Sequence, residues 1–299
     1  MKLLAISCVL FFNRNMKYTL HKNNLEAVID DHGAELVSLK ANDKEIMWQA
    51  EERYWSSSSL VLFPFIGRNC SDSYIYKGKT YDIPLHGFAL DRDFIVEQKE
   101  ESHLRLILKE DEDSLKIYPF RFTLAVDYEL TDHGLDVSFQ VINDSDKMMI
   151  YDLGYHPGFA LEDDLASYSV LFPEMDSIEE IGIVTRCMLN GNNKEVLLEN
   201  SRMKLDPSLF TESAKIYKGS GNTAILLDRK DQAVVKIRYD GFVYRTLWQT
   251  LNSDARFLCI EGWSGLPGRY DSIENIETVE TKRFLEPAQS ELFKVTIEI

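Results

Sequence analysis

Cysteine is scarce in this sequence of 299 residues, and its placement excludes several kinds of site. The four cysteines, Cys8, Cys70, Cys187 and Cys259, lie far apart and form no C-x-x-C pair and no Cys/His cluster at zinc spacing. The sequence therefore predicts reduced thiols, as in a cytoplasmic protein, and no metal site. Cys70 and Cys259 are expected to be packing residues and not nucleophiles, because no spacing pairs them with a histidine.

Positive charge is also in short supply. Lys and Arg total 33 against 49 Asp and Glu, which gives a formal net charge of -16. Nucleic acids and anionic membranes require a dense basic surface that such a chain lacks, so neither is an expected partner. A phosphate-binding glycine loop is missing as well, and no nucleotide cofactor is expected. A small neutral ligand fits this composition better.

Long hydrophobic runs are absent except near the start, where Leu3 to Phe12 is apolar. That run is too short to span a bilayer and lacks a convincing signal-peptide cleavage site. Our interpretation is that residues 1–15 are an upstream extension, that Met16 is the true start, and that residues 16–299 form one domain. A secretion signal is the alternative interpretation.

Long amphipathic helices, linkers and internal repeats are missing too, whereas period-two alternation recurs along the whole chain. Brief helical turns are expected only at Asp164 to Ser167 and at Glu280 to Leu285. Strands joined by hairpins are expected at Leu36–Leu39 and Ile46–Trp48, Leu60–Ile66, Phe94–Gln98, Leu104–Leu108, Phe122–Leu130, Leu135–Ile142, Ala224–Leu227, Val234–Arg238, Thr246–Gln249, Phe257–Ile260 and Leu292–Ile299. The predicted fold is all-β, a large antiparallel β-sandwich.

Four polar side chains stand out because each lies beside Gly or Pro and close to an aromatic residue: Arg68, His86, His156 and Glu261. Each alone has a plain structural explanation, such as a surface ion pair or a strand-end histidine bonded to a carbonyl. His156 is expected where a strand stops and a loop begins. The neighbouring aromatic residues are Phe65, Phe88, Phe159 and Trp263, and rings beside hydrogen-bonding groups suit a sugar site.

Five stretches give the sequence a resemblance to the aldose 1-epimerase, or galactose mutarotase, family and especially to its LacX-like branch. They are F-P-x-x-G-R at Phe63 to Arg68, L-H-G-F-A at Leu85 to Ala89, Y-P-F-x-F at Tyr118 to Phe122, G-Y-H-P-G-F at Gly154 to Phe159 and I-E-G-W-S-G-L-P at Ile260 to Pro267. They follow the family's order and cover nearly the whole chain from Met16.

The resemblance implies a β-supersandwich and the interconversion of α and β anomers of a free aldose without a cofactor. By position, Glu261 resembles the base that takes the anomeric hydroxyl proton and His156 the acid that protonates the ring oxygen. His86 resembles the second histidine, which holds the substrate, and Arg68 the arginine that binds hydroxyls. Hemiacetal opening needs such an acid and base together, and we expect them on opposite sides of the ring.

The sequence departs from the family at two points. The Glu261-Gly262-Trp263 stretch differs from the family's Glu-Pro-Trp, and the additional substrate-binding Asp is not obvious. Asp206 and Asp228 are candidates by position, and we predict Asp228, together with Arg68, Phe159 and Trp263, as substrate-binding residues.

Two other functions remain open. A hexose-6-phosphate epimerase would need basic residues that converge on the phosphate, and Arg92, Arg245 and Arg269 are candidates. A carbohydrate-binding or sensing protein would keep the cleft without catalysis. The sequence indicates a small-molecule sugar as the ligand but does not indicate an oligomeric state.

Overall fold

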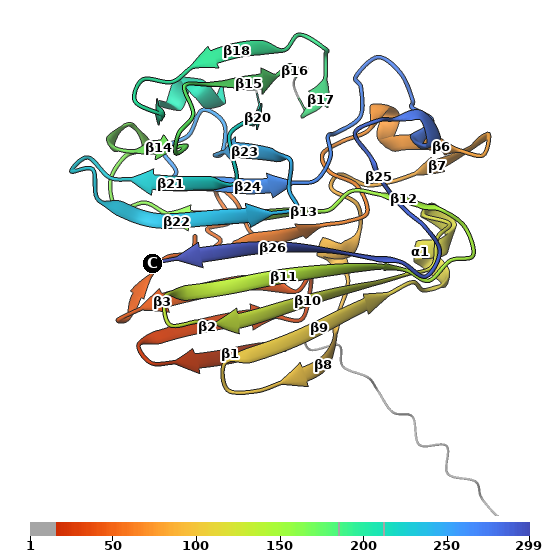
Figure 1. The fold of residues 1–299 in the computed structure, drawn as a ribbon, viewed down its shortest axis with the longest axis horizontal. Helices are drawn as coiled ribbons and strands as arrows, with labels where there is room; N and C mark the ends of the chain where they lie inside the picture. The colour runs from red at the N-terminus through yellow and green to blue at the C-terminus, as the bar shows by residue number, and fades with distance from the viewer. Residues whose placement is uncertain (1–15, 185, 212) are drawn as a thin grey trace, which may run out of the picture.

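The computed structural model describes residues 16–184, 186–211 and 213–299, so the expected extension over residues 1–15 lies outside the described part of the chain. Antiparallel β-sheet dominates the described residues, which confirms the predicted fold class (Figure 1). Two large sheets lie face to face, and smaller sheets cover their ends and edges.

Nine strands form the larger sheet, which runs through the middle of the molecule (Figure 1). In spatial order they are β19 (Arg202–Lys204), β14 (Ser169–Leu171), β21 (Thr223–Leu227), β22 (Ala233–Asp240), β26 (Ser290–Glu298), β11 (Gly134–Asn143), β10 (Phe122–Leu130), β9 (His103–Lys109) and β8 (Ile95–Lys99). The predicted strands in these segments are confirmed to within a few residues at each end.

Seven strands form the second sheet: β18 (Lys194–Leu197), β15 (Ser177–Ile181), β20 (Lys215–Lys218), β23 (Tyr244–Trp248), β24 (Phe257–Trp263), β13 (Gly154–Ala160) and β5 (Ser59–Leu62). β23 and β24 pair antiparallel across the predicted turn, with Thr246 opposite Glu261. β13 lies between β24 and β5. The neighbouring strands β24, β13 and β5 at one end of this sheet therefore bring together segments that are about 200 residues apart at most.

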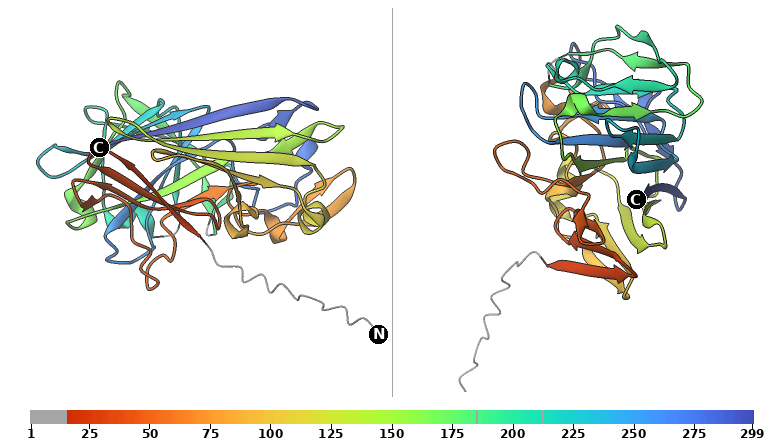
Figure 2. Two further views of the ribbon diagram at one scale, coloured as in Figure 1. Left: turned by 90° about the horizontal axis from the view of Figure 1, so that it is seen from below. Right: turned by 90° about the vertical axis from the view of Figure 1, so that its left-hand side faces the viewer.

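Smaller sheets complete the molecule. They are the four-stranded sheet β1 (Lys17–Lys22), β2 (Leu25–Asp30), β3 (Glu35–Ala41) and β4 (Lys44–Glu45), and the pairs β6 (Ser73–Tyr76) with β7 (Lys79–Asp82), β12 (Met149–Tyr151) with β25 (Arg283–Leu285), and β16 (Ile183–Val184) with β17 (Met188–Leu189). The four-stranded sheet and the strands around residues 170–220 lie at opposite ends of the molecule in the right-hand view of Figure 2.

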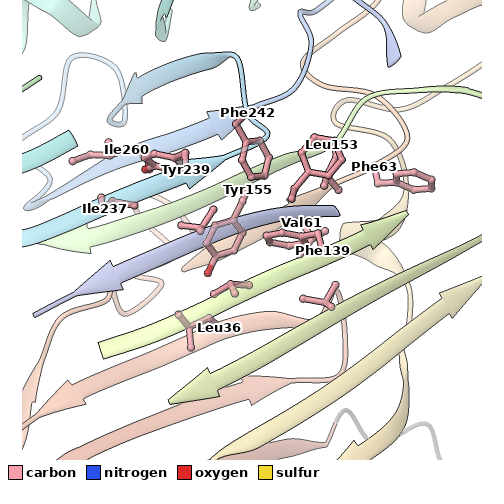
Figure 3. Close-up of a cluster of buried hydrophobic side chains, with 14 of the residues drawn as sticks. Leu36, Val61, Phe63, Phe139, Leu153, Tyr155, Ile237, Tyr239, Phe242 and Ile260 are labelled. Atoms are coloured by element: carbon pink, nitrogen blue, oxygen red, sulfur yellow. The ribbon is translucent and has the colours of Figure 1, made fainter. Parts of the chain in front are cut away.

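Apolar side chains from both large sheets meet in one core, because alternate residues of each strand point to the same face. The ring of Tyr155 on β13 lies 5.3 Å from that of Phe139 on β11 (Figure 3). The ring of Phe242, just before β23, lies 5.2 Å from that of Phe293 on β26. The core lies against one face of the seven-stranded sheet, and two smaller apolar clusters, which include Trp263 and Phe257, lie on its outer face.

The predicted helical turn at Glu280 to Leu285 is wrong. Its last residues form β25, which pairs with β12 in the register Met149↔Leu285. Pairing with a distant strand overrides the local helical preference here, because the ladder satisfies backbone groups that one helical turn would leave open. The other predicted turn is confirmed as the 3₁₀ turn Leu165–Ser167.

Two local elements also differ from the prediction. The strand expected at Ile46–Trp48 is β4, two residues earlier, because the Glu45 carboxylate accepts hydrogen bonds from the backbone N–H groups of Ile46 and Met47. The helix α1 (Glu112–Ile117) was not predicted. It begins at a capping box, in which Asp111 and Ser114 exchange hydrogen bonds with each other's backbone N–H groups.

Four further 3₁₀ turns complete the assignment: Cys70–Asp72, Ala89–Asp91, Pro207–Phe210 and Ile276–Thr278. Among the described cysteines, Cys70, Cys187 and Cys259 are free thiols. Within the described ranges, no helix has both the length and the apolar character needed to cross a membrane.

Candidate active site

His156 lies in the middle of β13 and points to the outer face of the seven-stranded sheet, away from the main core. The expectation that it ends a strand is therefore wrong. Successive residues of a strand point to opposite faces, so Tyr155 and Phe159 enter the core whereas His156 and Gly158 face away from it. The side chain of His156 is only 8% exposed. Its position is thus fixed by the sheet and not by a loop.

Glu261 lies beside His156 on the neighbouring strand β24. Its Oε1 is 3.3 Å from His156 Nε2, and its Oε2 accepts a 2.7 Å hydrogen bond from the indole N–H of Trp263. The carboxyl is 1% exposed. The acid–base pair is therefore side by side, and not on opposite sides of a ring as we expected.

His86 and Arg68 reach the same place from two loops that are tied together. The His86 backbone N–H donates to the carbonyl of Gly67, and the Gly67 N–H donates to His86 Nδ1 at 3.1 Å. Gly87 next to it has φ +78, and a Cβ there would lie 2.2 Å from the Phe63 carbonyl oxygen. Only glycine allows this close crossing. Because His86 Nδ1 accepts a hydrogen bond, its Nε2 carries the proton and faces the pocket as a donor.

Burial controls the protonation of these groups. It lowers the pKa of His156 to about 3, with a smaller contribution from nearby His86, and it raises the pKa of Glu261 well above its ordinary value. Burial and the Arg68 guanidinium together lower the pKa of His86 to about 4. Removal from water disfavours the charged form of each group. Burial therefore favours the neutral forms of both His156 and Glu261.

These residues line a pocket of about 490 Å³, which is within the usual size of small-molecule sites. Its described lining consists of Trp55, Leu60, Arg68, Leu85, His86, His156, Arg186, Cys187, Ser213, Ala214, Trp248, Leu251, Glu261 and Trp263. A hollow of the same volume beside β15 and β18 is lined by residues such as Ser177 and Lys218, and it contains neither histidine nor aromatic residues. Only the first pocket combines titratable groups with rings.

The structure brings together five of the seven predicted site residues: Arg68, His86, His156, Glu261 and Trp263. Phe159 is fully buried in the core, because it lies three positions after His156 on the same strand and so points to the other face.

Asp228 does not reach the pocket either. It lies in the turn between β21 and β22, where its carboxylate accepts hydrogen bonds from the backbone N–H groups of Lys230 and Gln232. Asp206, the other candidate, caps the 3₁₀ turn that follows it by accepting from the Ser208 N–H. Both carboxylates therefore stabilise local turns.

The arginines suggested for a phosphate do not converge on the pocket. Arg92 pairs with Asp111 at 3.2 Å, and Arg269 pairs with Asp271 at 2.8 Å. Arg245 is 1% exposed and donates to backbone carbonyl oxygens, including that of Tyr244 at 2.9 Å. The pocket is lined instead by Arg68 and Arg186.

The lining residues that sequence reasoning missed include Trp55, Trp248 and Arg186. The Trp55 ring lies 5.0 Å from that of His156, and a Cβ on Gly158 would lie 2.7 Å from the Trp55 ring. Trp248 lies 5.5 Å from His156. Trp248 could have been found, because it is two residues after Thr246, whose partner across the strands is Glu261. Trp55 and Arg186 lie in connecting segments that carry no periodic signal.

A buried ion pair supports the loop that follows Glu261. Lys282 donates to Asp152 and, at 3.3 Å, to the carbonyl of Leu266. Burial raises the pKa of Asp152 to about 6, although Lys282 opposes this shift. The pair joins the start of β13 to the end of β24. Among the described residues, no group of three or more His, Cys, Asp or Glu side chains could hold a metal ion.

Comparison with known proteins identifies the same family across most of the chain. A family model described as aldose 1-epimerase matches residues 16–294. The plasmid-encoded protein LacX of Lactococcus lactis subsp. lactis is 30% identical over 253 residues, which covers 78% of this chain and 83% of LacX.

Solved structures agree with this match. A galactose mutarotase related enzyme from Lactobacillus acidophilus is 32% identical with a TM-score of 0.86, and the match covers 95% of this chain and 98% of that one. A galactose mutarotase-like protein from Lactobacillus casei is 30% identical with a TM-score of 0.89, over 95% of this chain and 99% of that one.

Proposed function

Because the chain belongs to the aldose 1-epimerase family, we propose that it interconverts the α and β anomers of a free aldohexose by opening and closing the sugar ring. The observation that carries the proposal is the contact between His156 and Glu261 in the pocket. The anomeric and ring oxygens are both bonded to C1, so a base and an acid that serve them must be neighbours. A side-by-side pair meets this requirement.

In the proposed reaction, Glu261 takes the proton of the anomeric hydroxyl while His156 gives a proton to the ring oxygen. The C1–O5 bond breaks, and C1 becomes the carbonyl carbon of the open chain. Rotation about C1–C2 presents the other face of the carbonyl, and closure returns both protons. The pair needs one proton in total, and their contact allows it to lie on His156 before ring opening and on Glu261 afterwards.

Contacts in the pocket offset the free energy needed to form the charged, reactive pair of His156 and Glu261. Burial favours the neutral pair, whereas ring opening starts from imidazolium and carboxylate. Trp263 donates to Glu261 Oε2, which stabilises the carboxylate. Trp55 lies against His156, where an aromatic face favours a cation. His86 donates from Nε2 and Arg68 from its guanidinium to substrate oxygens, and the chemistry requires no cofactor.

Polarimetry or exchange NMR on freshly dissolved α-glucose and α-galactose tests the proposal. The wild type should accelerate equilibration, and Glu261→Gln and His156→Asn should each reduce the rate by about 10²- to 10⁴-fold, the usual contribution of a positioned acid or base. His133→Asn, in an exposed turn, is the control and should keep the wild-type rate. Full activity in either pocket variant removes that residue from its role. Sugar binding without acceleration would favour a sensing protein.

A further inference from the structure

Asp152 and Lys282 form a charged pair that is buried outside the pocket. The side chain of Asp152 is 0% exposed and that of Lys282 is 3% exposed, and neither is among the described lining residues. The proposed reaction does not use either group. Replacement of a buried ion pair by apolar side chains of similar volume is often neutral or stabilising, so stability by itself does not explain the pair.

The pair holds the loop that follows β24. Lys282 Nζ donates to the Asp152 carboxylate and, at 3.3 Å, to the carbonyl oxygen of Leu266 in this loop. Gly265 packs directly on the carboxylate, because a Cβ there would lie 2.0 Å from Asp152 Oδ1. Only a residue without a side chain allows so close an approach. The loop over residues 264–268 is therefore fixed to the buried pair at two adjacent positions.

The same pair contacts the segment that carries Arg68. The Asp152 N–H donates to the carbonyl oxygen of Pro64 at 2.7 Å. Lys282 Nζ lies 4.7 Å from the centre of the Phe65 ring, where the aromatic face attracts a cation. Pro64 and Phe65 belong to the F-P-x-x-G-R stretch, which ends at Arg68. Both partners of the ion pair therefore help to fix this stretch.

The loop and the Arg68 segment also contact each other. The Gly268 N–H donates to the carbonyl oxygen of Arg68 at 3.0 Å, and Pro267 Cβ is 2.5 Å from where a Cβ on Gly67 would be. The Arg68 guanidinium pairs with Asp72, but Asp72 is exposed, and an exposed partner restrains a side chain only weakly. The backbone position of Arg68 therefore decides where its guanidinium lies.

His156 and Glu261 do not depend on the buried pair in this way. They lie within β13 and β24, and pairing between these two strands fixes their backbone. Arg68 lies instead in the connection between β5 and the 3₁₀ turn Cys70–Asp72. Loss of the buried pair should therefore move Arg68 while the two strand residues stay in place.

We propose that Asp152 and Lys282 are positioning residues, which place the Arg68 guanidinium over the acid–base pair and so determine how tightly the sugar is bound. The inference rests on the proposed anomer interconversion, in which Arg68 donates to substrate oxygens. Neither positioning residue touches the substrate.

The combined change Asp152→Asn and Lys282→Met removes both charges, keeps side chains of similar size and leaves no unpaired charge in the interior. Urea unfolding checks that the variant folds. Polarimetry on α-glucose and α-galactose should show a KM about tenfold or more above the wild-type value and a kcat within about threefold, because substrate binding is weakened and the acid–base pair is intact. A purely structural role would instead lower the amount of active enzyme, and so the apparent kcat, without changing KM.

Lys282→Met alone is a second variant in case the combined one does not fold. Burial raises the pKa of Asp152 to about 6 even with Lys282 present, so without the lysine the carboxyl can take up a proton and become neutral. The bond to Leu266 is lost in this variant too. The same rise in KM is therefore expected.

An Arg68→Gln background shows whether the pair acts through Arg68. Arg68→Gln alone should raise KM about tenfold or more, and adding the combined change should raise it no further, because both changes remove one interaction. Independent effects would multiply. The matched control is Asp136→Asn with Lys294→Met, a Lys–Asp pair at 2.8 Å between β11 and β26 that does not line the pocket. This control should keep the wild-type KM and kcat.

Two results would overturn the inference: a wild-type KM in the combined variant, or a rise in KM that persists at full size in the Arg68→Gln background. If the wild type binds sugar without epimerising it, the proposed function fails, and affinity replaces KM in the same set of variants. Quenching of the fluorescence of Trp55, Trp248 and Trp263 measures that affinity, since all three line the pocket. A wild type that neither binds nor epimerises these sugars overturns both proposals.

Discussion

Replacing His156 by glutamine should make the fold less sensitive to acid. Burial lowers the pKa of His156 from 6.5 to about 3, so the imidazole is neutral in the folded protein at pH 5 while it is protonated in the unfolded chain. A group whose folded pKa is lowered costs stability as the pH falls below its unfolded pKa. At pH 5, which is 1.5 pH units below 6.5, the cost is about 2 kcal/mol, at about 1.4 kcal/mol per unit.

Urea unfolding at pH 7 and pH 5 measures this cost. Going from pH 7 to pH 5, the wild type should lose about 2 kcal/mol more than His156→Gln, with the other titrating groups common to both proteins. This expected difference in unfolding free energy does not depend on how far below pH 5 the pKa of His156 lies in the folded protein. His133→Gln, in an exposed turn, is the control and should behave as the wild type does.

The opposite result would show that the pair is ionic. If His156 were an imidazolium paired with a Glu261 carboxylate, it would keep its proton on folding, and acid would not cost the wild type this energy. Equal responses of the wild type and His156→Gln would therefore refute the neutral pair.

Three further changes test other parts of the site. Glu261→Gln should stabilise the fold at neutral pH. Burial raises the pKa of Glu261, and a carboxyl whose pKa is raised on folding lowers the stability of the fold as the pH rises above 4.5. Thermal unfolding at pH 7 should therefore show a higher Tm for the variant than for the wild type, and a lower Tm would contradict the burial argument. Gly158→Ala should displace the Trp55 ring, whose nearest atom is 2.7 Å from the new Cβ. The free energy of unfolding, measured in urea, should fall by about 1–3 kcal/mol. Wild-type stability would mean that the ring moves freely. Asp228→Asn should leave the affinity for sugar unchanged in a fluorescence titration, because its carboxylate bonds its own turn; a tenfold weaker affinity would restore the predicted substrate-binding role.

The sequence by itself determined many of the strands outside residues 169–218, and it determined the short motifs. Period-two alternation predicted β10 and β11 to within a residue or two, since alternation follows directly from burial of one face. Position in the motifs also selected His86, His156 and Glu261, which the structure places in one pocket. Local signals failed where distant contacts dominate, as at β25, whose partner strand β12 lies more than 130 residues earlier.

Only the tertiary structure decided which side chains share the pocket and how their charges are set. The register of β13 directs His156 to the outer face of the sheet and Phe159 to the core, and a shift of one residue would reverse both. Arg186 and Trp55 reach the pocket from connecting segments, which carry no periodic signal. The preference of His156 and Glu261 for their neutral forms results from burial by many chain segments, and burial is a property of the packed fold that no single stretch of sequence contains.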